Sequence, residues 1–156
     1  MGRNGQHLIC KNENRLYLGG RIVAGAPAKT VLKCLFGGIA YGLVEILWRG
    51  YTHPSMVITG GLCFVMICGI NEKFSRKPLF VRSAACTLAV TCAEFCVGML
   101  VNHVLNMEVW DYSDRWLHLF GQICPMYMGL WFALCMALSF LLPKLHFSVI
   151  SSNLRK

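Results

Sequence analysis

Two acidic residues lie inside long apolar stretches of the sequence, where carboxylates are rare. Glu45 falls in the stretch at 30–48, and Glu94 in the stretch at 79–101. An acidic side chain near the centre of a membrane-spanning helix costs about 2.5–3.5 kcal/mol to insert, so it must be paired, protonated or hydrated. Because intramembrane acids often bind an ion or a substrate, Glu45 and Glu94 are the leading candidates for such binding.

The residues around Glu45 favour a helix face that packs inside the protein. Gly38 and Gly42 are four residues apart, a spacing of small residues that lets another helix approach closely. Glu45 and Arg49 continue the same face, so we expect an ion pair between them. A ligand or ion contact for Glu45 is the alternative. Gly38 and Gly42 are predicted helix-packing positions and a candidate interface between copies of the chain.

Glu94 belongs to a polar stripe on an otherwise apolar stretch. Polar or small residues recur here at intervals of three or four and therefore share one helix face. They are Thr87, Thr91, Glu94, Gly98 and Asn102. No basic residue lies within a turn of Glu94, so its partner must come from another helix, from water or from its own proton. Structural and functional roles both fit this pattern.

The segment that follows Asn102 combines aromatic and acidic residues. Aromatic residues at the end of a membrane span usually anchor at the headgroup level, but the acceptors in residues 110–113 could also tie this loop to a helix end. The loop and both acids are expected in the same half of the membrane, where they would line a polar pocket. The candidate substrate- or ion-binding residues are Glu94, Glu45, Asn102, Trp110, Asp111, Tyr112 and Ser113.

The elements that must position these residues are membrane-spanning helices. With 56% hydrophobic residues and a mean hydropathy of +0.53, the chain is too apolar for an ordinary soluble domain. The apolar stretches lie at about 30–48, 55–70, 79–101 and 121–142. As helices, three of them reach about 28–34 Å, enough for the ~30 Å hydrocarbon core, whereas the second reaches about 24 Å. We expect a short second span, with a re-entrant hairpin or an extension by Pro54 and Asn71 as alternatives.

These stretches predict an all-α, integral membrane four-helix bundle at 30–142, flanked by a basic tail at 1–29 and a second tail at 143–156. If the N-terminus is cytoplasmic, 13 of the 15 basic residues fall at the inner face, and only Arg49 and Arg115 fall outside. By the positive-inside rule, both termini are expected in the cytoplasm and the protein in the inner (plasma) membrane. The net charge of +8 therefore indicates topology and lipid contact, with no nucleic-acid partner expected.

Motifs for catalysis and for nucleotide binding are absent from the sequence. Gly20 to Gly25, followed by Lys29 and Thr30, is not a P-loop, because the second glycine is not followed directly by Lys-Ser/Thr. No Ser/His dyad, His-Glu-x-x-His or paired Asp motif supports an enzyme. The nine cysteines are spread over different stretches and match no disulfide framework, so we expect packing residues, with no metal and no cofactor.

Two segments carry a family resemblance. The first is Tyr41–Arg49, with the sequence Tyr-Gly-Leu-Val-Glu-Ile-Leu-Trp-Arg. The second combines Glu94, the Trp-Asp-Tyr-Ser tetrapeptide at 110–113, the Gly-Gln-Ile-Cys start at 121–124 and Trp131. Over residues 31–142 they resemble a family of small bacterial membrane proteins, the ABC-transporter type IV or CmpB-like permeases. The resemblance implies a membrane subunit of a transporter.

The leading interpretation is a transporter or permease subunit with an outward-facing polar pocket. Glu94 and Glu45 would bind a cation or a substrate amine there, or exchange a proton. Four helices are few for a transport path, so we expect a homo-oligomer or a partner membrane protein, with a separate ATPase subunit as a further partner. The alternative is a non-transporting accessory protein that binds lipid or another membrane protein and in which the acids are structural.

Overall fold

The computed structural model describes residues 17–18, 21–22 and 26–153. It divides into two compact units, residues 1–32 and 33–156, which are described separately. In the first unit, strands β1 (Tyr17–Leu18) and β2 (Arg21–Ile22) pair antiparallel. Apart from this short hairpin, every secondary-structure element of the described residues is a helix, in agreement with the predicted all-α class. The rest of the predicted basic tail before residue 26 lies outside the described residues, as do 154–156 at the other end.

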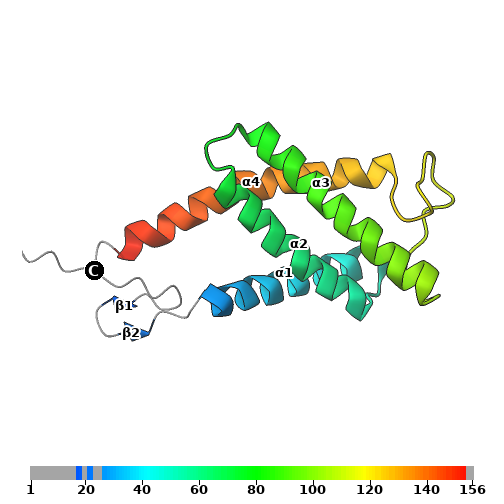
Figure 1. Cartoon of the computed structure of the whole chain (residues 1–156), viewed down its shortest axis with the longest axis horizontal. Coiled ribbons are helices and arrows are strands. Elements are labelled where there is room, and N and C mark those ends of the chain that lie inside the picture. The colour runs from blue at the N-terminus through cyan, green and yellow to red at the C-terminus, as the bar shows by residue number, and fades with distance from the viewer. Residues whose placement is uncertain (1–16, 19–20, 23–25, 154–156) are drawn as a thin grey trace, which may run out of the picture. The chain divides into compact units, whose positions relative to one another are not determined.

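Within the described residues, four helices are long and apolar enough to cross a membrane, which confirms the prediction of a helical membrane protein. The elements are α1 (Ala26–Arg49), α2 (Pro54–Lys73), α3 (Leu79–Gly98), the π-helix η1 (Met99–Val104) and α4 (Pro125–Asn153). In Figure 1, α2 and α3 run in opposite directions and both cross α4. α2 is one helix of 20 residues that includes both Pro54 and Asn71, and α4 continues beyond residue 142.

Local sequence signals set the helix ends. Gly50 adopts a positive φ of 80° directly after α1, and its N–H donates to the Ile46 carbonyl, so it terminates the helix in a backbone conformation that favours glycine. Pro54 and Pro125 are the first residues of α2 and α4. A proline at the first helical position lacks only an N–H that has no intrahelical acceptor. The fourth helix therefore begins four residues after the expected start at 121.

Glycines bring α1 and α2 into direct contact. A Cβ added at Gly38 would lie 2.6 Å from the Val57 carbonyl oxygen, and one at Gly42 would lie 3.1 Å from Val57 Cγ2. On the opposite helix, Gly61 faces Cys34, where an added Cβ would lie 2.8 Å from the sulfur. Small residues permit such close packing of helices in a membrane. The expected interface between copies at Gly38 and Gly42 is therefore corrected, because α2 of the same chain already occupies this face.

The core of α2, α3 and α4 is built from small and medium-sized side chains, whereas large apolar side chains point outward. Cys63, Ile67, Cys86, Val90 and Cys135 form the buried cluster. The described cysteines are free thiols, and those in the cluster pack as small apolar groups. Side chains at least 48% exposed on the outer faces include Leu35, Ile58, Leu62, Leu88 and Leu141. Such faces require hydrocarbon around them, so the chain is a membrane protein in contact with the lipid bilayer.

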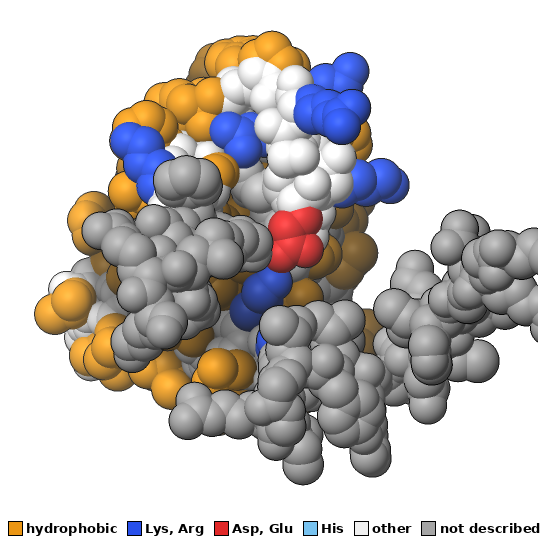
Figure 2. Space-filling model, turned by 90° about the vertical axis from the view of Figure 1, so that its left-hand side faces the viewer, with side chains coloured by type: hydrophobic (Ala, Val, Ile, Leu, Met, Phe, Trp, Pro, Cys, Tyr) orange, Lys and Arg blue, Asp and Glu red, His pale blue; other side chains and the backbone are white. Residues whose placement is uncertain are grey.

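The two ends of the bundle differ in charge. Figure 2 faces the end at which α2 is connected to α3, and several Lys and Arg side chains are visible there. The described basic residues near this end are Lys33, Lys73, Arg76, Lys77, Arg82 and Lys144. The opposite end carries Arg49 and Arg115 together with the acids Glu108, Asp111 and Asp114. Most of the described basic residues thus lie at one end of the helices, as their positions in the sequence indicated.

Candidate functional site

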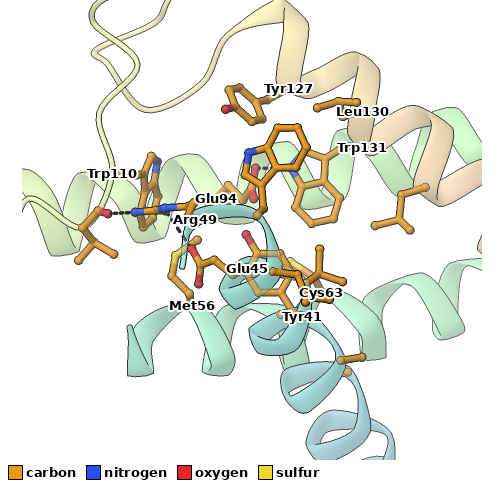
Figure 3. A pocket seen from close by; sticks show the side chains of 18 of the residues that line it. Tyr41, Glu45, Arg49, Met56, Cys63, Glu94, Trp110, Tyr127, Leu130 and Trp131 are labelled. Carbon is orange, nitrogen blue, oxygen red and sulfur yellow. Dashed lines mark hydrogen bonds and ion pairs between the residues drawn. The ribbon is translucent and has the colours of Figure 1, made fainter. Parts of the chain in front are cut away.

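A cavity of about 990 Å³ lies between the helices and the loop at 105–124, within the second unit (Figure 3). Both intramembrane acids line it, Glu45 from α1 and Glu94 from α3. Figure 3 shows Glu45 beside Arg49 and Glu94 beside Trp131, with Tyr41 close by. Among the candidate residues from the loop, Trp110, Asp111 and Tyr112 also line the cavity, whereas Asn102 and Ser113 do not. The fold therefore brings five of the seven candidate residues to one space.

Glu45 is bound by residues at the end of its own helix and just after it. Arg49 Nη1 lies 2.9 Å from Glu45 Oε1, and the Thr52 hydroxyl donates to the other carboxylate oxygen. Glu45 is only 6% exposed. The predicted ion pair is therefore present, and it follows from the four-residue spacing, which places the two side chains one above the other on the helix.

Arg49 also attaches the loop to α1. Its Nη2 donates to the Val109 carbonyl at 2.7 Å and to the Tyr51 hydroxyl at 2.8 Å. A guanidinium group offers several donors in a fixed plane, so one side chain can neutralise Glu45 and hold the loop backbone at the same time. At this point of the cavity wall, the charges of Glu45 and Arg49 cancel, and both side chains are hydrogen-bonded within the chain.

Glu94 has a different partner, and that partner comes from another helix. The Trp131 indole Nε1 of α4 donates to Glu94 Oε2 at 2.6 Å. The Trp131 ring is itself stacked on Tyr41 of α1, with centroids 5.8 Å apart and planes 7° apart. Within the described residues no basic side chain pairs with Glu94, and its second oxygen has no hydrogen-bond partner. Glu94 is therefore a carboxylate held by a neutral donor at the edge of a cavity.

Asn102 holds the loop instead of lining the cavity. Its Nδ2 donates to the Trp110 carbonyl at 2.8 Å and to Gln122 Oε1 at 2.7 Å, while its Oδ1 accepts from the Val109 N–H at 2.7 Å. The sequence stripe assumed a regular α-helix through Asn102, but the backbone changes to the π-helix η1 after Gly98. A π-helix has more residues per turn, so a four-residue spacing no longer keeps Asn102 on the Glu94 face. This corrects the expected place of Asn102 in the pocket.

The tetrapeptide at 110–113 is divided between the cavity and the loop interior. Trp110 is buried, and its Nε1 donates to the Gln122 carbonyl at 3.2 Å. The Tyr112 ring stacks on Tyr127 of α4 with centroids 4.4 Å apart, and burial raises the pKa of its hydroxyl. Ser113 donates to Asp111 Oδ1 through its hydroxyl at 2.6 Å and its N–H at 2.9 Å. Asp111 thus closes a turn within the loop instead of capping a helix end.

Gly121 allows this turn to pack on the segment before α4. It has a positive φ of 67°, and an added Cβ would lie 2.8 Å from Ser113 Oγ. Its carbonyl accepts from the Tyr112 N–H at 2.8 Å. A side chain at this position would therefore be strained by the backbone and would separate the two parts of the loop.

Sequence reasoning gave no role to three side chains that shape the site: Tyr41, Gln122 and Trp131. Trp131 and Tyr41 were noted only as parts of the family resemblance. A signal was available for Trp131, because a tryptophan N–H inside a membrane span needs an acceptor and a buried carboxylate is a strong one. Tyr41 lies four residues before Glu45 and therefore shares its helix face.

The fold and the site define a multi-pass helical membrane protein with a cavity that contains carboxylates. A sequence model of the family described as Putative ABC-transporter type IV matches residues 45–155 of the 156. The chain belongs to this family, which confirms the resemblance found in the sequence. The match begins at Glu45 and includes Glu94, the 110–113 tetrapeptide and Trp131. No curated protein and no solved structure matches the chain.

Proposed function

We propose that this chain is a permease-type component of a transport system of the plasma membrane, and that its cavity binds a positively charged substrate or ion at Glu94. The observation that carries the proposal is a difference between the two acids: Arg49 neutralises Glu45, whereas no basic side chain of the described residues pairs with Glu94, which lines the cavity. A partly buried carboxylate without a paired cation favours a cation that can enter and leave.

The charge of the whole cavity also favours a positively charged ligand. Carboxylates outnumber guanidinium groups along its lining: Glu45, Glu94, Glu108, Asp111 and Asp114 against Arg49 and Arg115. A cleft lined mainly by one sign of charge, with apolar walls, concentrates the field and raises the local concentration of the opposite ion. An anionic substrate would be repelled at the same place.

The orientation in the membrane is part of the proposal. The end with Lys73, Arg76 and Lys77 would face the cytoplasm by the positive-inside rule, with both termini on that side. The cavity, which includes residues of the opposite end such as Asp111 and Asp114, would then open outward.

Partners follow from what the chain lacks. Its sequence has no P-loop, so energy from ATP would come from a separate ATPase subunit. The cavity of one chain is formed by four spans, and a second membrane-embedded copy or partner would complete a path across the bilayer. No catalytic step on a substrate is proposed for this chain.

The test compares Glu94→Gln with wild-type protein in lipid nanodiscs. Glutamine keeps an acceptor for the Trp131 N–H but carries no charge, so the thermal midpoint should stay close to that of wild type. Binding of radiolabelled methylammonium and of rubidium, used as probes, should fall about tenfold, as expected when a charged contact is lost. Glu72→Gln is the matched control, because Glu72 is exposed and pairs with Lys33 at the basic end.

A second candidate function, an accessory protein without transport, is favoured by the internal bonding of the loop. Arg49, Asn102 and Gln122 hold it through contacts within the chain. If Glu94→Gln lowers the thermal midpoint strongly and wild-type protein binds neither probe, the acid is structural and the accessory role replaces the proposed one.

A further inference from the structure

Many aromatic side chains line the cavity, and some of them lie around Glu94. Nine of the lining residues are aromatic: Phe36, Tyr41, Trp48, Tyr51, Phe64, Trp110, Tyr112, Tyr127 and Trp131. No lysine or histidine occurs among the described residues that line it. In Figure 3, Tyr41, Tyr127 and Trp131 lie around Glu94. Aromatic faces attract weakly hydrated cations such as alkylammonium groups, and a nearby carboxylate adds a full opposite charge.

This composition fits an organic cation better than a metal ion. Hard metal ions require several oxygen ligands that converge at about 2–2.6 Å. Among the described residues, no group of three His, Cys, Asp or Glu side chains converges in that way. At Glu94 a single carboxylate oxygen is free, and its surroundings are aromatic rings. An alkylammonium group needs no closed shell of oxygens, because it keeps apolar substituents against the rings.

The other part of the cavity is apolar, and it follows the facing sides of α1 and α4. We call it the apolar arm, lined by Phe36, Ala40 and Val44 of α1 and by Leu130, Leu134 and Leu138 of α4. The four-residue spacing on both helices turns each set toward the same space and extends the arm over roughly 12 Å. Phe36 and Val44 are each 63% exposed, so the protein itself does not fill the arm.

We infer that the cavity binds an amphipathic organic cation, with its ammonium group beside Glu94, Tyr41 and Trp131 and its alkyl chain along the apolar arm. The inference rests on the proposed function and names its substrate class. The cationic head accounts for the excess of carboxylates, and the chain accounts for an arm that carries no polar side chain. An alkyl chain that enters the arm from water buries apolar surface and adds affinity, whereas the charged head determines which sign of ligand is bound.

The experiment measures binding to the protein in nanodiscs of phosphatidylglycerol, a lipid without an ammonium group, with empty nanodiscs subtracted. The probes are hexyltrimethylammonium, tetramethylammonium, hexanol and hexyl sulfate. Hexyltrimethylammonium should bind saturably and more tightly than tetramethylammonium, whereas hexanol and hexyl sulfate should not compete with it. Glu94→Gln should weaken hexyltrimethylammonium by about tenfold, and Glu72→Gln should leave its affinity unchanged.

A second pair of variants tests the apolar arm. Leu134→Trp fills the arm, so it should weaken hexyltrimethylammonium several-fold while leaving tetramethylammonium unchanged. Leu88→Trp is the matched control, because Leu88 is 63% exposed on α3 and does not line the cavity. If Leu134→Trp fails to fold, Leu138→Phe provides the same test at the far end of the arm.

Four outcomes overturn the inference. Equal binding to wild type and Glu94→Gln would mean partition into the bilayer only. Full competition by phosphatidylethanolamine would identify a lipid headgroup site. Methylammonium binding that depends on Glu94, without any effect of chain length or of Leu134→Trp, would refute the amphipathic substrate but leave the proposed function standing. Absence of any binding that depends on Glu94 would refute both.

Discussion

Glu45 and Glu94 line the same cavity, yet their surroundings differ in kind. Glu45 has a cation 2.9 Å away on its own helix and a hydroxyl donor from Thr52, so its charge is satisfied locally. Glu94 receives one hydrogen bond, from the neutral indole of Trp131 on another helix. A buried charge that is paired is part of the fold, whereas one held by a neutral donor retains electrostatic potential for a ligand. The comparison separates a structural acid from a candidate binding acid.

The two sides of α1 show the same contrast in packing. Toward α2, glycines at 37, 38, 60 and 61 leave so little room that an added Cβ would meet the facing helix. Toward α4, the apolar arm is unfilled by side chains. α1 is thus packed closely on α2, whereas toward α4 it makes the Tyr41–Trp131 stacking contact and borders the cavity.

Arg49→Met should have the largest effect on stability. It leaves Glu45 buried without a cation and frees the Val109 carbonyl, so we expect a loss of about 3–5 kcal/mol in unfolding free energy. The measurement is unfolding by heat or denaturant in detergent micelles. Arg115→Met is the control, because Arg115 lies 3.4 Å from Asp114 in an exposed pair worth about 0–1 kcal/mol. Equal effects of the two changes would break the distinction between the acids.

Trp131→Phe should have the next largest effect. It removes the donor to Glu94 but keeps an aromatic ring against Tyr41, so we expect a loss of about 1–3 kcal/mol. Trp116→Phe serves as the control, since Trp116 is 81% exposed. An unchanged unfolding free energy for Trp131→Phe would show that Glu94 does not need this donor, and the acid would then be satisfied by water or a proton.

Gly38→Ala sharpens the contrast between the two sides of α1. The new methyl group would lie 2.6 Å from the Val57 carbonyl oxygen, a backbone atom that cannot turn away, so we expect a loss of about 1–2 kcal/mol. Gly129→Ala, on α4, meets nothing within 4 Å and should be neutral or slightly stabilising. If Gly38→Ala changed only the oligomeric state and left the unfolding free energy unaltered, the assignment of this face to α2 would be refuted.

The smallest effect is expected from pH at the loop. The Ser113 hydroxyl and N–H hold the pKa of Asp111 below its ordinary value of 3.8. Because the pKa is lowered in the folded state, ionised Asp111 stabilises the loop at pH values above the ordinary pKa. This stabilisation is lost as the pH falls through the pKa of the folded state. Tryptophan fluorescence of the loop should therefore change in acid for wild type and not for Asp111→Asn. An identical acid transition in both proteins would assign it to another carboxyl group.

The sequence predicted the features that depend on neighbours along one helix. The apolar stretches predicted the four helices because length and hydropathy are local properties, and the Glu45–Arg49 pair follows from their four-residue spacing. Asn102 was misplaced because the change to a π-helix after Gly98 alters the register of every later residue. The start of α4 at Pro125 was missed because Ile123 and Cys124 extend the apolar pattern although they belong to the loop.

By itself, the sequence determined a helical membrane protein with two acids in its spans and a charge difference between its ends. It also identified the family, through motifs that are contiguous in the chain. Only the tertiary structure decided which residues face each other: Trp131 with Glu94, Gly38 with Val57, and Tyr41 with Trp131. The physical reason is that such contacts depend on how each helix is rotated about its axis and where helices cross. Spacing along one helix fixes neither of these.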